Sequence, residues 1–147
     1  MSPGSSRRRL EEGGLTMPTA HRVLLILGGT LATILSLAIL FSPAAFYAGY
    51  GIEVDGMTNL LNELKAPALV ILALGAIQGL GALQIRHHHL GIGAGILLYM
   101  GFGLSRLVAM MTDGPPAHAL IAVTASELVI GLLFVFAYWR LKRSKAG

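Results

Sequence analysis

Four long apolar segments constrain this chain more than any other feature of its sequence. They cover residues 23–41, 58–83, 90–111 and 120–139. At about 1.5 Å of rise per residue, a helix of each length can cross a hydrocarbon core of about 30 Å. Of the 147 residues, 54% are hydrophobic and 12% are charged, which is more apolar material than a soluble domain of this size needs. The sequence therefore predicts an all-α polytopic membrane protein with a bundle of four transmembrane helices.

The basic residues gather at only one end of these predicted helices. The segments between residues 42 and 57 and between 112 and 119 contain no Lys or Arg, and Lys65 is the single basic residue near that side. The other side carries nine: Arg7, Arg8, Arg9, Arg22, Arg86, Arg140, Lys142, Arg143 and Lys145. Because Lys and Arg are retained on the cytoplasmic side, we expect both termini and the connection at residues 84–89 to be cytoplasmic. This orientation favours an inner (plasma) membrane protein.

The two ends of the chain differ from the predicted membrane domain, which we place at residues 21–141. Residues 1–20 are rich in Ser, Gly, Pro and Arg without periodicity, which is typical of a disordered cytoplasmic tail. Within it, Met17 is an alternative start to Met1. Residues 142–147 form a short basic segment that we interpret as a second cytoplasmic tail.

Three features should shape the predicted helices on the side opposite the termini. Residues 44–56 combine three aromatic residues with two acidic ones, a composition typical of an interfacial loop. Pro67 falls inside the second predicted helix and should kink it. Asp113, Gly114 and Pro115 predict a turn after the third helix, with Asp113 bonded to its own backbone.

Glycines recur on the predicted helices at spacings that suit close packing. The second helix has Gly75 and Gly79, four residues apart, and the first has Gly29 near Thr33. The third carries Gly91, Gly95, Gly101 and Gly103. Small residues allow two helix backbones to approach closely in lipid. We interpret them as contacts within one bundle, and the alternative is a homodimer.

A small group of charged residues lies within the predicted spans. Counted from the outer ends, Glu127 is about 12 Å down the fourth helix and Arg106 about 9 Å down the third. Similar depths on antiparallel neighbours predict an ion pair. Glu63, with Asn62 and Lys65 beside it, lies near the start of the second helix and could join the pair near the outer leaflet. The cluster either fixes helix register or binds a polar or amphipathic ligand or relays a proton.

Several chemistries are excluded or disfavoured by the residue types. The chain has no Cys, so disulfides, thiolate metal sites and cysteine catalysis are excluded. His87, His88 and His89 are consecutive and point in different directions, which argues against one metal site and suggests pH-dependent charge at the cytoplasmic headgroups. The chain has no hydrolase triad, phosphate loop or zinc-protease motif, and no basic aromatic face for nucleic acid. We expect no cofactor.

The order of these features resembles a known family. Asn62 to Lys65 open the second helix, Arg106 comes late in the third, Asp113 to Pro115 follow it, and Glu127 lies with Gly131 in the fourth. This pattern is similar to the domain of unknown function 4345 family of small four-helix membrane proteins, over about residues 22–141. The chain departs from the pattern at Ser105, where the family commonly has Gly. The resemblance implies a fold and a role for the residues Asn62, Glu63, Arg106, Asp113 and Glu127, and no activity.

Three functions are compatible with the sequence. We prefer a non-enzymatic protein whose polar pocket near the outer leaflet binds a lipid-like or small polar molecule, or stabilises a partner membrane protein. The second is a small-molecule or proton-coupled transporter, which would require a dimer because four helices without inverted repeats do not enclose a path. The third is a membrane enzyme using Glu63 or Glu127 as acid or base, although no nucleophile or metal set accompanies them. Expected partners are membrane lipids and a second copy or another membrane protein.

Overall fold

The computed structural model describes residues 17–144, and this part of the chain is helical and contains no strand. The elements are α2 (Thr19–Phe41), α3 (Pro43–Ala48), α4 (Thr58–Lys65), α5 (Ala68–Leu83), the 3-10 turn η1 (Ile85–His87), α6 (His88–Asp113) and α7 (His118–Ser144). Four segments are long and apolar enough to cross a membrane: Thr19–Phe41, Thr58–Leu83, Ile85–Asp113 and His118–Arg143. The prediction of an all-α protein with four membrane-spanning helices is confirmed.

The predicted tails fall mostly outside the described residues. Of residues 1–20, the structure describes only 17–20, and α2 already begins there, at Thr19. Of residues 142–147, it describes 142–144, which continue α7.

A short helix occupies the start of the segment that was predicted as an interfacial loop. Ser42 leaves the helical region at φ −140° and ψ 52°, which ends α2, and Pro43 begins α3 in the first turn, where its missing N–H costs no helical hydrogen bond. The loop prediction is therefore wrong for residues 44–48. The aromatic-rich composition that suggested a loop is equally compatible with one and a half turns of helix at the membrane surface.

Pro67 interrupts the second span as predicted. The N–H of Ala66 still donates to the carbonyl of Asn62 at 3.0 Å, but proline has no N–H with which to continue the ladder, and α4 gives way to α5. The hydroxyl of Ser36 on α2 donates a 2.6 Å hydrogen bond to the carbonyl of Ala68, the first residue of α5. This bond fixes the start of α5 against α2.

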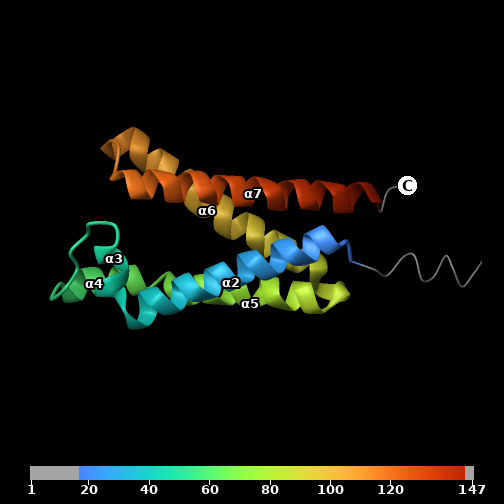
Figure 1. Ribbon diagram of the computed structural model, residues 1–147, viewed down its shortest axis with the longest axis horizontal. Coiled ribbons are helices and arrows are strands. Elements are labelled where there is room, and N and C mark those ends of the chain that lie inside the picture. Colours follow the sequence, from blue (N-terminus) through green and yellow to red (C-terminus); the bar gives the residue numbers. More distant parts are fainter. Residues whose placement is uncertain (1–16, 145–147) are drawn as a thin grey trace, which may run out of the picture.

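The helices are arranged as two pairs. In Figure 1, α2 lies along α5, α7 lies along α6, and α6 runs diagonally from the end of α5 to the start of α7. Both described chain ends lie at the end of the molecule where η1 joins α5 to α6, whereas α3 and α4 lie at the opposite end. We call the first end the termini end and the second the α3 end.

Glycines allow the closest helix contacts. A Cβ on Gly81 of α5 would lie 2.9 Å from the Cα of Gly91 on α6, and a Cβ on Gly29 of α2 would lie 2.9 Å from the carbonyl oxygen of Gly75 on α5. These contacts are intramolecular, as expected for a single bundle. By contrast, a Cβ on Gly79 would meet nothing within 4 Å.

One aromatic side chain joins the two pairs in the core. Phe134 of α7 is fully buried, and its ring fills the space left by Gly28 on α2 and Gly95 on α6, where an added Cβ would lie 2.9 Å and 2.5 Å from the ring. Tyr99 of α6 stacks on Phe134 with ring centroids 5.8 Å apart and donates a 2.6 Å hydrogen bond to the carbonyl of Gly28. These two rings fill the middle of the bundle.

The glycine contacts lead to a first prediction. Gly29→Ala should lower the free energy of unfolding by about 1–3 kcal/mol, because its Cβ would overlap the backbone of α5, which cannot rotate away. Gly79→Ala is the matched control and should be neutral or stabilising by up to about 1 kcal/mol, since alanine favours helix and the site is open. Thermal unfolding in detergent would measure both. Equal effects would contradict this packing.

Candidate functional site

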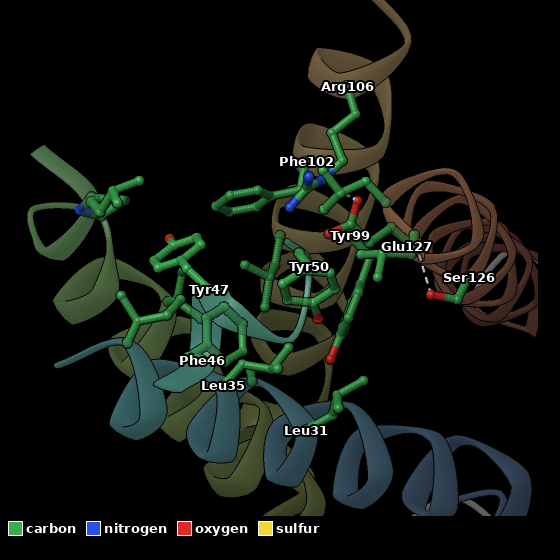
Figure 2. Close-up of a pocket in the computed structure, with 18 of the residues that line it drawn as sticks. Leu31, Leu35, Phe46, Tyr47, Tyr50, Tyr99, Phe102, Arg106, Ser126 and Glu127 are labelled. Atoms are coloured by element: carbon green, nitrogen blue, oxygen red, sulfur yellow. Dashed lines mark hydrogen bonds and ion pairs between the residues drawn. The ribbon is translucent and has the colours of Figure 1, made fainter. Parts of the chain in front are cut away.

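A cavity of about 330 Å³ lies between the two helix pairs towards the α3 end (Figure 2). Each α-helix of the described residues, from α2 to α7, contributes to its wall. Fourteen of the twenty residues that line it are aliphatic or carry aromatic rings without a hydroxyl group: Leu31, Ala32, Leu35, Ile39, Phe46, Ile52, Leu64, Pro67, Ile71, Leu98, Phe102, Leu120, Val123 and Ile130. The other six are Tyr47, Tyr50, Tyr99, Arg106, Ser126 and Glu127. The cavity is thus mainly apolar, with a few polar groups.

The predicted ion pair borders this cavity. Nε of Arg106 lies 3.1 Å from Oε2 of Glu127, so the two antiparallel helices bring these charges together. Arg106 extends from α6 and Glu127 from α7, and the pair lies on the cavity wall in Figure 2. The side chain of Glu127 is 16% exposed and that of Arg106 is 36% exposed. The pair is therefore only partly enclosed by the protein.

The contact between Arg106 and Glu127 leaves one donor and one acceptor without a hydrogen bond. Although 3.1 Å is within hydrogen-bonding distance, the N–H bond of Arg106 Nε does not point at Oε2 of Glu127. Both atoms are buried, and neither has a hydrogen-bond partner among the described residues. Buried polar atoms are normally hydrogen-bonded, so an unpaired donor beside an unpaired acceptor marks a place where a bound molecule could complete both.

Three tyrosines place hydroxyl groups on different elements around the cavity. Tyr47 lies on α3, Tyr50 in the following turn, and Tyr99 on α6. The hydroxyl of Tyr99 is already used, because it donates to Gly28, so Tyr99 offers the cavity its ring rather than a free donor. Burial raises the pKa of Tyr47 above its ordinary value, and the guanidinium of Arg106 acts in the opposite direction. Tyr47 therefore remains a neutral phenol, able to donate or accept, at neutral pH.

The remaining predicted site residues lie outside this cavity. Asn62 and Glu63 on α4 are exposed, and Lys65 is half-buried. Neither Glu63 nor Lys65 forms an ion pair with any described residue, so the structure brings together Arg106 and Glu127 without a third charge. On α4 the side chain that reaches the cavity is Leu64. The rotation of α4 about its axis directs Leu64 towards the cavity and leaves Glu63 exposed on another face of the helix.

Asp113 is the last residue of α6, and its side chain is exposed. Gly114 follows with φ +94°, a conformation that favours glycine and turns the chain towards α7. The structure thus places Asp113 at the predicted turn and away from the cavity. Asp113 therefore marks the end of α6 and does not belong to the cavity.

His21 and the consecutive residues His87, His88 and His89 lie at the termini end, at the starts of α2 and α6, whereas the cavity lies towards the α3 end (Figure 1). His88 is only 4% exposed, and its ring packs edge to face on His21, with centroids 5.2 Å apart. The expectation that all three consecutive histidines add charge at the headgroups is therefore wrong for His88, which the start of α6 turns into the bundle. Among residues 17–144 no group of three or more His, Asp or Glu side chains is placed to hold a metal ion.

Sequence reasoning missed the aromatic part of the site. From the sequence, Phe46, Tyr47 and Tyr50 are assigned to an interfacial loop, and neither Tyr99 nor Phe102 is singled out. Their only sequence signal was the concentration of rings directly after the first span. That signal indicates contact with an interface and does not show that the rings face α6.

Comparison with known proteins identifies the family. The sequence profile described as "Domain of unknown function (DUF4345)" matches residues 20–138. The chain belongs to the DUF4345 family. The resemblance inferred from the order of motifs is thus confirmed, and the match includes the second and third spans and most of the first and fourth. Neither the curated proteins nor the solved structures compared with this DUF4345 member gave a match.

The ion pair of this DUF4345 member can be tested by a double-mutant cycle. Arg106→Leu alone should destabilise by about 3 kcal/mol, the lower part of the range for breaking a buried pair, because Arg106 is 36% exposed. Adding Glu127→Leu should restore much of the loss, with a coupling of about 0.5–3 kcal/mol in thermal unfolding.

The matched control for this cycle combines Arg106→Leu with Asp113→Asn. Asp113 is exposed and forms no ion pair with a described residue, so these two changes should be additive. Additivity of the Arg106 and Glu127 substitutions would instead show that the two charges do not stabilise one another.

Proposed function

We propose that this protein binds a membrane-borne amphipathic small molecule in the cavity between its two helix pairs, without catalysing a reaction on it. The observation that carries the proposal is the combination of an apolar cavity with an ion pair whose buried donor and acceptor lack partners. Sites for small molecules are typically concave and mostly apolar, with a few polar groups that fix orientation.

The size of the cavity supports a ligand rather than a packing defect. Its volume of about 330 Å³ is far larger than the voids usual in protein interiors and falls at the lower end of the range for ligand pockets, about 300–1,000 Å³. Because the cavity walls come from both helix pairs, a bound molecule would contact α2 or α3 on one side and α6 or α7 on the other. A ligand would therefore stabilise the bundle as well as occupy it.

The polar end of the cavity supports an amphipathic ligand rather than a hydrocarbon. A purely apolar molecule would leave Nε of Arg106 and Oε2 of Glu127 without hydrogen bonds. A molecule with a hydroxyl in its head group can accept from Nε and donate to Oε2, and its apolar part can lie along Leu35 and Ile39 of α2. Ionisable groups inside a membrane often mark such binding sites.

We place the cavity in the outer half of the inner membrane, with the termini end in the cytoplasm. The basic residues support this orientation: Arg22, Arg86, Arg140, Lys142 and Arg143 belong to the termini end, whereas the half of the bundle towards the α3 end has Lys65 and the ion-paired Arg106 among the described residues. A ligand would then enter from the outer leaflet.

The orientation predicts the activity of reporter fusions. A phosphatase that is active only outside the cytoplasm should be active when inserted near Gly51 or Gly114, and inactive at the C-terminus or after His87. A fluorescent reporter that matures only in the cytoplasm is the complementary control. Phosphatase activity at the C-terminus would overturn the orientation.

The cavity itself can be tested by filling it. Leu35→Trp places a large ring inside the cavity, whereas Leu37→Trp, on the same helix, adds the same ring to an exposed position. After extraction in mild detergent, wild type and Leu37→Trp should retain the same small molecule in mass spectrometry, and Leu35→Trp should lose at least nine-tenths of it. Equal retention by all three proteins would refute binding in this cavity.

A further inference from the structure

The aromatic residues of this chain are concentrated at the cavity. The chain has ten residues of this kind: five Phe, four Tyr and one Trp. Half of them are among the twenty residues that line the cavity, namely Phe46, Tyr47, Tyr50, Tyr99 and Phe102. Of the other five, Phe134 is buried in the core, whereas Phe41, Phe136, Tyr138 and Trp139 are exposed on α2 and α7. The one cavity therefore gathers as many rings as the rest of the chain together.

The rings come from two sides of the cavity. Phe46 packs edge to face with Tyr47 and Tyr50, at centroid distances of 5.1 Å and 5.4 Å, and this cluster belongs to α3 and the turn after it. Tyr99 and Phe102 come from α6, one turn apart. Figure 2 shows all five side chains around the same space. Since aromatic rings pack favourably in stacked or edge-to-face arrangements, this space suits a further ring.

The charges of the site limit the head group that such a ligand can carry. Arg106 and Glu127 are the two charged side chains that line the cavity, and at 3.1 Å they neutralise one another. A phosphate or an ammonium group would compete for one partner and leave the other charge without its counter-ion, which is unfavourable inside a membrane. An uncharged head group avoids this loss.

The unpaired atoms specify what an uncharged head group needs. Nε of Arg106 requires an acceptor, and Oε2 of Glu127 requires a donor. The neutral phenol of Tyr47 lies on the same cavity. A ring carbonyl can accept from Nε of Arg106, and a ring hydroxyl can in addition donate to Oε2 of Glu127; neither group separates the ion pair.

We infer that the ligand of this cavity is an uncharged six-membered ring bearing carbonyl or hydroxyl oxygens on an apolar tail, a molecule of the quinone, quinol or phenol class. This inference rests on the proposed function, because it names the chemical class of the ligand in the same cavity. The ring lies among the α3 and α6 aromatic residues, its oxygens face the ion pair, and its tail follows the aliphatic wall of α2. No chemical change of the ring is required.

The test compares three probes on the purified full-length protein in lipid nanodiscs, with binding measured by calorimetry. Decylubiquinone carries an uncharged oxygenated ring and a ten-carbon tail, 1-decanol carries a similar tail without a ring, and lauroyl lysophosphatidylcholine carries a charged head group. Decylubiquinone should bind at least tenfold more tightly than either of the others. Leu35→Trp should abolish its binding, whereas Leu37→Trp should not.

A ring-deleting variant tests the role of the aromatic residues directly. Phe46→Leu combined with Phe102→Leu keeps an apolar wall but removes two rings, so it should weaken decylubiquinone at least tenfold and change 1-decanol less than threefold. Phe136→Leu, on the exposed face of α7 outside the cavity, is the matched control and should change neither. The comparison of probes on the wild type stands even if this variant fails to fold.

The outcomes separate the inference from the proposed function. Equal affinities for decylubiquinone and 1-decanol, both abolished by Leu35→Trp, would overturn the ring inference and leave the amphipathic site intact. Preference for the lysolipid would overturn the argument from charge and assign the site to a charged lipid. Binding of no probe, or binding that Leu35→Trp does not reduce, would refute both.

Discussion

The close backbone contact between α5 and α6 determines where this protein has room for a ligand. Gly81 and Gly91 allow the two helices to touch near the 3-10 turn that joins them. Straight helices that cross at one end separate towards the other. Because α2 packs on α5 and α7 packs on α6, the two helix pairs diverge towards the α3 end (Figure 1). The cavity is the space that this divergence leaves.

Phe134 and Tyr99 determine how far that space extends. Their stacked rings fill the bundle between the glycine contact and the cavity, and the hydrogen bond from Tyr99 to Gly28 ties this layer to α2. Tyr99 therefore belongs to the core on one side and to the cavity wall on the other. One wall of the site is therefore built on buried core residues, which hold its geometry.

The sequence predicted what depends on local pattern and short connections. The four spans follow from length and apolarity, and the pairing of Arg106 with Glu127 follows from two antiparallel helices joined by a short turn. It did not predict α3, and it did not predict the exposure of Glu63, which depends on how α4 is rotated about its own axis before Pro67. The aromatic residues of the cavity were missed for a related reason, because a ring near an interface can face lipid, water or another helix, and only tertiary packing decides.

The short connection between α6 and α7 has a consequence for the biogenesis of the protein. Neither helix enters the bilayer easily with an isolated charge, since an ionised side chain at the helix centre costs about 2.5–3.5 kcal/mol on insertion scales. Synthesised one after the other, the two helices can leave the translocon together as a hairpin in which Arg106 already neutralises Glu127. The last two spans then form one insertion unit, and the cavity exists only after that unit has joined α2 and α5.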